Sequence, residues 1–183
     1  LTIAVNLSAP QFDKDRIVDV VTSSLAETGL LPGRLELEIT ESLLIERPDD
    51  VLATLMRLKE LGVSIAMDDF GTSYSSLSYL LKFPFDKIKI DKSFISAIDH
   101  DKAACDVLRT IGSLGKTLGI RITAEGVETE EQVTFLRAIA CDQLQGYFFA
   151  KPLDSSGVAT FLLGNAARRL KTAETNTPSS KAA

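Results

Sequence analysis

The sequence predicts an α/β protein built on a parallel sheet. Short apolar runs rich in β-branched residues alternate with longer segments of helical periodicity, which is the pattern of consecutive βα units. The chain has 183 residues, of which 45% are hydrophobic and 25% charged, an ordinary composition for a globular domain with a sizeable core. We therefore expect one α/β domain, with a fibrous or largely disordered chain excluded.

Six strands are expected, each a short run of apolar residues. They are residues 2–7, 35–40, 63–68, 86–91, 120–125 and 143–147. Between them, apolar residues at helical spacing predict helices in residues 15–29, 49–62 and 101–119, with Val107 and Leu108 on the buried face of the last. Thr129 and Gln132 form a capping box that predicts the start of a further helix.

Net charge and hydropathy exclude several classes of partner. The formal net charge is −5, which argues against a broad basic surface for duplex nucleic acid. No apolar run approaches the roughly 18 residues needed to cross a bilayer. Cys105 and Cys141 are far apart and lack C-x-x-C spacing, so we expect reduced thiols and a cytoplasmic domain, although the parent protein could be membrane-anchored through other segments.

Polar side chains end all six expected strands. They are Asn6, Glu38 with Glu41, Asp68 with Asp69, Lys89 with Asp91, Glu125 with Glu128, and Gln145. A single acid at such a place is typical of a helix N-cap or a solvated turn. In a parallel barrel, however, the carboxyl ends of all strands converge at one mouth. The repetition therefore favours a shared site.

The side chains at these ends are typical ligands of hard cations. Carboxylate and amide oxygens suit Mg2+ or Mn2+, and two such ions about 3.5–4 Å apart can clamp a phosphodiester for in-line attack. The adjacent acids Asp68 and Asp69 would repel each other unless a cation or water reached both. The sequence therefore predicts a metal site with Lys89 inside it.

Other candidate motifs are weaker. His100 has no second histidine or nearby nucleophile, so we expect a surface or capping residue. The run GSLGKTLG lacks the glycine at position 110 that a phosphate-binding loop needs, and it lies late in a helix. Phe148 and Phe149 fit packing in a wall or lid better than a platform for stacking bases.

Five motifs resemble the EAL domain family, bacterial phosphodiesterases that hydrolyse cyclic di-GMP. They are VNLSAPQF, LEITES, DDFGTSYSSLSYLLKFPFDKIKIDKSF, ITAEGVET and LQGYFFAKPL, in this order from residue 1 to about residue 163. The resemblance implies a TIM-like (β/α) barrel at residues 1–163. We expect residues 164–183, which lose the apolar stripe, to be a frayed helix end and a disordered tail or linker.

The resemblance also implies roles for the strand-end residues. Asn6, Glu38 and Asp68 would bind one metal ion, and Asp68 would bridge to a second ion bound by Asp69 and Glu125. The two ions would be Mg2+ or Mn2+, and the product would be linear pGpG.

Two further catalytic roles and a regulatory loop follow from the same resemblance. Lys89 would hold a hydroxide or a phosphate oxygen, and Gln145 would position water. Glu41 would brace a loop associated with contact in a homodimer and with signals from upstream sensory or diguanylate cyclase domains. The residues of that loop named by the resemblance are Phe70, Gly71, Thr72, Ser73 and Tyr74.

This sequence departs from the family pattern at two places. Ser73 stands where the family usually has glycine, which would strain the backbone if that position needs φ > 0. The E-A-L signature, with its metal-binding glutamate, does not occur in the printed residues. We expect it upstream, on one of two N-terminal strands that would complete the usual eight, so the barrel should be incomplete here with six strands.

Two alternatives to the phosphodiesterase stay open. One is a catalytically inactive EAL-like module that binds cyclic di-GMP or a protein partner. The other is an unrelated metal-dependent barrel such as an aldolase or isomerase, which would leave the ordered motifs unexplained.

Overall fold

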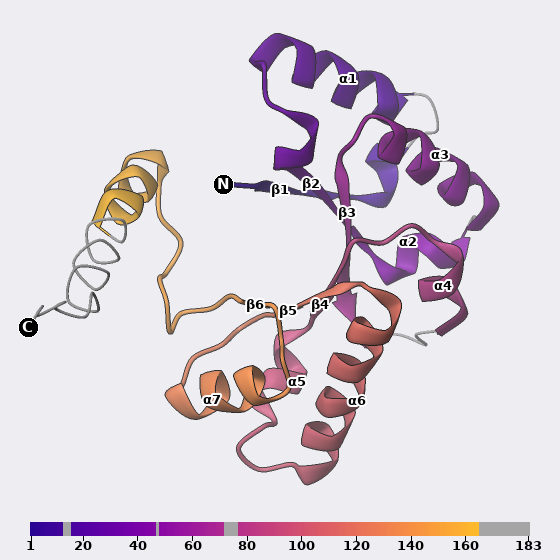
Figure 1. Cartoon of the computed structure of the whole chain (residues 1–183). Coiled ribbons are helices and arrows are strands. Elements are labelled where there is room, and N and C mark those ends of the chain that lie inside the picture. The colour runs from indigo at the N-terminus through magenta and orange to yellow at the C-terminus, as the bar shows by residue number, and fades with distance from the viewer. Residues whose placement is uncertain (13–15, 47, 72–76, 165–183) are drawn as a thin grey trace, which may run out of the picture. The chain divides into compact units, whose positions relative to one another are not determined.

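The computed structural model describes residues 1–12, 16–46, 48–71 and 77–164, and its described strands form a single parallel sheet. The strands pair in chain order, β1-β2-β3-β4-β5-β6 (Figure 1). They are β1 (Ile3–Leu7), β2 (Leu35–Thr40), β3 (Ser64–Phe70), β4 (Lys87–Ile90), β5 (Arg121–Ala124) and β6 (Gln143–Leu144). The prediction of a TIM-like α/β barrel, incomplete with six strands, is confirmed.

Helices connect the strands and cover one face of the sheet. The helices and turns of 3-10 helix are η1 (Ala9–Gln11), α1 (Arg16–Thr28), η2 (Pro32–Arg34), α2 (Glu41–Glu46), α3 (Pro48–Glu60), α4 (Leu77–Lys82), α5 (Lys92–Ser96), α6 (Lys102–Leu118) and α7 (Glu130–Ala138). The capping box predicted at Thr129 and Gln132 opens α7.

The hydrophobic core lies between the sheet and the helices. Alternate strand residues such as Ile39, Ile65 and Ile88 are fully buried and pack with helix residues such as Leu55 and Leu108. The opposite face of the sheet, which we call the inner face, instead carries polar side chains at the intervening positions. The apolar residues therefore pack the sheet against the helices, and the polar and charged side chains gather on the inner face.

Two aspartates fix the starts of neighbouring strands by the same contact. Asp86, just before β4, accepts a hydrogen bond of 2.8 Å from the amide of Ile65 in β3. Asp142, just before β6, accepts one of 2.7 Å from the amide of Ile122 in β5. Each carboxylate satisfies an amide at the beginning of the adjacent strand, which helps to hold the parallel register.

Three details differ from the sequence-based expectations. The short helices α2, α4 and α5 were not predicted, because five or six residues are too few to show helical periodicity. Val107 is 43% exposed, so placing it on the buried face of α6 was wrong. The last strand ends at Leu144, since the Gln145 carbonyl and the Phe148 amide hydrogen-bond to Val127 in the loop after β5.

The chain divides into two compact units, Leu1–Phe149 and Ala150–Ala183. In the second unit, described as far as residue 164, residues 155–164 form a helix. Asp154 precedes it and accepts hydrogen bonds from the Gly157 amide at 2.7 Å and the Ser156 hydroxyl at 2.8 Å. The predicted tail lies almost wholly outside the described residues, and the predicted domain boundary stays a prediction. No described helix is long and apolar enough to cross a membrane.

We predict that Gly115→Ala destabilises the fold. A Cβ on Gly115 in α6 would lie 2.6 Å from Cγ1 of Ile122 and 2.9 Å from the carbonyl oxygen of Ile120. Overpacking of this kind costs about 1–3 kcal/mol, more than the roughly 1 kcal/mol that alanine gains over glycine in a helix. Urea unfolding should show a lower free energy of unfolding for Gly115→Ala, whereas the exposed control Ser113→Ala should change little. Equal stability of the two variants would contradict close packing of α6 on β5.

Candidate metal site at the strand ends

Lys89 stands at the centre of the candidate site. It is on β4, its side chain is 6% exposed, and its ammonium forms three ion pairs. The partners are Glu38 of β2 at 2.6 Å, Asp68 of β3 at 3.0 Å and Glu125 after β5 at 2.8 Å. A lysine ammonium has three N–H donors, so these carboxylates use its full capacity. The Lys89 side chain therefore links residues of β2, β3 and the loop after β5.

A bulge in β3 brings the adjacent acids Asp68 and Asp69 to the same site. In a regular strand their side chains would point to opposite faces. Here the register with β4 shifts between Met67 and Phe70, and Asp69 adopts a left-handed backbone with φ of 55°. Aspartate tolerates this conformation better than most residues. As a result, Asp68, Asp69 and Glu125 present carboxylate oxygens within 4.8 Å of one another.

Asn6 of β1 completes the cluster on the other side. Its register partner is Glu38, and its amide lies beside the carboxylates of Glu38 and Asp68. With the nitrogen turned toward them, the amide donates to both at 3.1 Å; with the oxygen turned toward them, it faces only acceptors. The second orientation is favourable only when a cation lies between the oxygens. Asn6 can therefore serve as a hydrogen-bond donor or as a metal ligand.

The electrostatics of the cluster favour bound cations. Burial raises the pKa of the Glu125 carboxyl, although the Lys89 ammonium opposes the shift. Burial and the neighbouring Asp68 charge raise the pKa of Asp69. Burial alone would lower the pKa of Lys89, but its hydrogen bonds to the three carboxylates outweigh that effect and raise the pKa, so the lysine stays charged. The negative charges are thus only partly balanced, and a divalent cation would balance them further.

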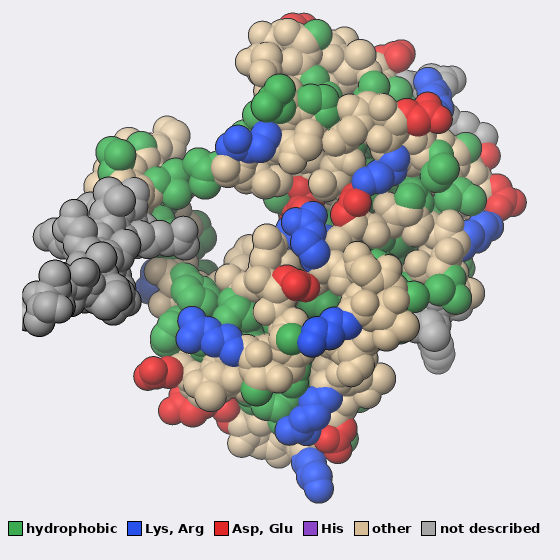
Figure 2. Space-filling model, viewed as in Figure 1, with side chains coloured by type: hydrophobic (Ala, Val, Ile, Leu, Met, Phe, Trp, Pro, Cys, Tyr) green, Lys and Arg blue, Asp and Glu red, His purple; other side chains and the backbone are tan. Residues whose placement is uncertain are grey.

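The donor set fits a divalent cation. All the side chains offer oxygen ligands of the type that Mg2+ and Mn2+ prefer. They come from β1, β2, β3 and the loop after β5, and the acid cluster is partly accessible rather than sealed. Figure 2 shows acidic and basic side chains close together near the middle of the face in view. Asn6, Glu38, Asp68, Asp69 and Glu125 are the residues that could hold the ions.

The remaining predicted site residues are Gln145, Glu41 and the loop after β3. Gln145 lines, with Glu38 and Lys89, a hollow of about 290 Å³ on the inner face. Glu41, the first residue of α2, is 2% exposed. The loop that it would brace is described only at Phe70 and Gly71; Thr72, Ser73 and Tyr74 lie outside the described residues, so the regulatory role stays a prediction.

Gly71 adopts a backbone conformation that favours glycine. Its φ is 95°, and a Cβ there would lie 2.7 Å from the ring of Phe94 on α5. The glycine therefore allows the chain after Asp69 to pass closely over α5. No side chain other than hydrogen fits this place without a shift of the ring or the loop.

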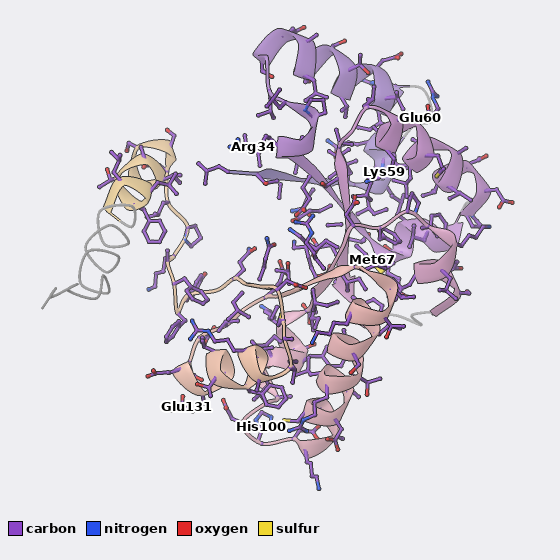
Figure 3. The ribbon with its side chains drawn as sticks, in the orientation of Figure 1. Arg34, Lys59, Glu60, Met67, His100 and Glu131 are labelled. Carbon is purple, nitrogen blue, oxygen red and sulfur yellow. The ribbon has the colours of Figure 1, made fainter. Side chains whose placement is uncertain are left out.

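Some strand-end residues serve the fold instead. Asp91 is the N-cap of α5 and accepts a hydrogen bond of 2.9 Å from the Ser93 amide, which is the ordinary role of such an acid. Glu128 is exposed, and so is His100 in the turn before α6 (Figure 3). Met67 is labelled in the same view and packs in the core at 1% exposure. These residues lie outside the cluster of carboxylates.

Sequence reasoning missed the ion pair directly below the site. Lys87 and Glu36 lie two residues before Lys89 and Glu38 on the same strands, and their charged atoms are 2.6 Å apart. The available signal was the alternation of charged and apolar residues in LELEIT and KIKI.

The fold and the site together define a TIM-like α/β protein with a cluster of oxygen ligands at the carboxyl ends of its strands. A family model for the EAL domain matches residues 1–152. The chain therefore belongs to the EAL domain family.

Named relatives and solved structures agree with this family. The cyclic di-GMP phosphodiesterase NbdA of Pseudomonas aeruginosa is 41% identical over 162 residues, which are 88% of this chain and 21% of NbdA. The bifunctional diguanylate cyclase/cyclic di-GMP phosphodiesterase MucR of the same organism is 45% identical over 151 residues, 82% of this chain and 22% of MucR. This chain spans about a fifth of the length of the curated relatives it matches.

Two solved complexes resemble the chain closely. The structure of the PaMucR phosphodiesterase in complex with c-di-GMP has a TM-score of 0.82 at 43% identity. The match covers 86% of this chain and 64% of the PaMucR chain. A manganese/cy-diGMP complex of Klebsiella pneumoniae BlrP1 has a TM-score of 0.77 at 32% identity. The match covers 82% of this chain and 39% of the BlrP1 chain.

We predict that Asp68→Asn weakens binding of Mn2+ by at least about tenfold, because the change removes a charge at the centre of the oxygen cluster and even indirect changes at metal sites cost 10- to 100-fold. Isothermal titration calorimetry would measure the affinity. Asp106→Asn is the matched control, since Asp106 forms an exposed pair with Arg109 away from the site. An Asp68→Asn variant that binds Mn2+ as tightly as this control would refute the metal assignment.

Proposed function

We propose that the protein carrying this chain hydrolyses cyclic di-GMP to linear pGpG with two divalent ions, Mg2+ or Mn2+. The observation that carries the proposal is the convergence of Asp68, Asp69 and Glu125 beside the Lys89 ammonium. Family membership and the named activities of NbdA and MucR support the choice of substrate.

The chain's own residues account for several parts of this chemistry. Asn6, Glu38 and Asp68 would hold one ion, and Asp68, Asp69 and Glu125 the other. When bound, the ions supply a water of lowered pKa and charge neutralisation at the phosphodiester. The site could bind an anionic substrate although the chain carries a net charge of −5, because bound cations would make the local electrostatic field positive.

Lys89 has a second part in the proposal. It remains protonated, because its hydrogen bonds to the carboxylates raise its pKa. A charged lysine at this depth can orient the carboxylates and stabilise negative charge that develops on a phosphate oxygen or on the attacking oxygen. Gln145, which lines the same hollow as Glu38 and Lys89, would orient water. Homodimer contact, upstream sensory or cyclase domains and a cytoplasmic location remain predictions of the family resemblance.

The test is hydrolysis of cyclic di-GMP by the full-length natural protein, with the products separated by chromatography. We expect pGpG in the presence of Mg2+ or Mn2+ and none with EDTA. Asp68→Asn should lower kcat by more than about 100-fold, beyond the 10- to 100-fold cost of changes outside the metal's direct ligands. Asp106→Asn should retain activity, because its exposed pair with Arg109 lies outside the cluster.

The outcomes separate the proposal from its alternative. Binding of cyclic di-GMP without product would favour a receptor module over an enzyme. Metal-independent hydrolysis, or full activity of Asp68→Asn, would contradict the two-metal proposal.

A further inference from the structure

A second pair of charged side chains lies on the inner face, two residues closer to the amino ends of β2 and β4 than the candidate metal site. We call this pair the lower layer and the pair of Glu38 and Lys89 the upper layer. Glu36 and Lys87 precede Glu38 and Lys89 by two residues, so all four side chains point to the same face of the sheet. Lys87 Nζ is 2.6 Å from Glu36 Oε1, the same separation as between Lys89 and Glu38. The structure therefore contains two parallel ion pairs, of which the proposed function uses only the upper one.

Ala66 of β3 lies between the two ion pairs, level with one member of each. In the register of the sheet, Ala66 of β3 pairs with Glu38 on one side and with Lys87 on the other. Ala66 is fully buried, and its methyl group leaves room for long side chains from β2 and β4 to meet across it. The two layers are thus adjacent, separated by one step of about 6.6 Å along each strand, twice the rise of one residue.

The lower pair is more deeply buried than the acid cluster above it. The side chains of Glu36 and Lys87 are 4% and 8% exposed, whereas that of Glu125 is 20% exposed. A buried carboxylate without a partner is strongly unfavourable and attracts any cation within reach. Without Lys87, the Glu36 carboxylate would lack its partner. Lys89, two residues further along β4, has a long and flexible side chain that could then turn toward Glu36.

We propose that Lys87 is a positioning residue: by neutralising Glu36, it keeps the Lys89 ammonium on the carboxylates at the strand ends. Lys87 acts through Lys89 and does not touch the reacting atoms. The catalytic consequence of this inference rests on the proposed function, whereas the position of Lys89 does not.

Arg121 of β5 is the other cation near Glu36. Its Nη2 is 3.9 Å from Glu36 Oε2, beyond hydrogen-bond distance, and its side chain is 46% exposed. Lys87 therefore supplies the close contact, and Arg121 adds a weaker attraction from the rim of the hollow.

The decisive comparison is Lys87→Met against the double variant Lys87→Met/Glu36→Gln, both in the full-length natural protein. In the crystal structure of Lys87→Met, we expect Lys89 Nζ to bond to Glu36 and to leave the carboxylates above. In the double variant, the buried charge is gone, so Lys89 should return to Glu38, Asp68 and Glu125. If Lys87→Met does not fold, Lys87→Gln takes its place, because glutamine can still donate to Glu36 without cancelling its charge.

Kinetics supply a second readout. Lys87→Met should lower kcat for cyclic di-GMP by about tenfold or more, as changes behind a metal site commonly do, with little change in KM. The double variant and Lys87→Arg should recover most of this loss. Lys59→Met is the control. Lys59, on α3 and labelled in Figure 3, pairs at 2.7 Å with Asp86 just before β4, and neither residue lines the hollow of the inner face, so kcat should be unchanged.

Several results would overturn the inference. One is a Lys87→Met structure in which Lys89 keeps its three carboxylates, whether or not Arg121 moves onto Glu36. Another is an equal loss of kcat in the single and double variants, which would indicate a purely structural role. If the unmodified protein shows no hydrolysis, the proposed function fails, but the crystal structures still decide where Lys87 holds Lys89.

Discussion

The strand ends depend on one ammonium group. Lys89 draws together carboxylates from β2, β3 and the end of β5, side chains that would otherwise repel one another in a partly buried place. Such an arrangement is costly for stability, since each charge loses water and the carboxylates still outnumber the lysine. The structure tolerates it because the core on the opposite face of the sheet is independent of these charges. The apolar core and the charged cluster thus lie on opposite faces of the same strands.

The bulge in β3 makes the charged cluster possible. A regular strand would place Asp69 on the helix side, against the apolar core, where an unpaired carboxylate is not tolerated. The shifted register and the left-handed backbone at Asp69 turn its carboxylate to the side of Asp68, and Gly71 lets the chain continue past the ring of Phe94. The backbone distortion therefore sets the geometry of the site, a use of bulges that recurs near functional residues.

Much of this architecture could be predicted from residue patterns. Apolar runs located every strand to within a few residues, and the polar residues that follow them indicated the site around Lys89. The bulge could not be predicted, because two adjacent acids say nothing about backbone dihedral angles. The Glu36–Lys87 pair was missed although charged and apolar residues alternate in both strands, because alternation alone does not show whether the charged face is enclosed or solvent-exposed.

The most direct test of the metal site is a crystal structure of the protein grown with Mn2+, with anomalous scattering used to locate the metal. We expect anomalous density among the carboxylates of Asp68, Asp69 and Glu125, at oxygen–metal distances of about 2.0–2.5 Å, typical of hard cations on oxygen ligands. Density elsewhere, or none while Lys89 keeps all three of its ion pairs, would contradict the claim that the bulge builds a metal site.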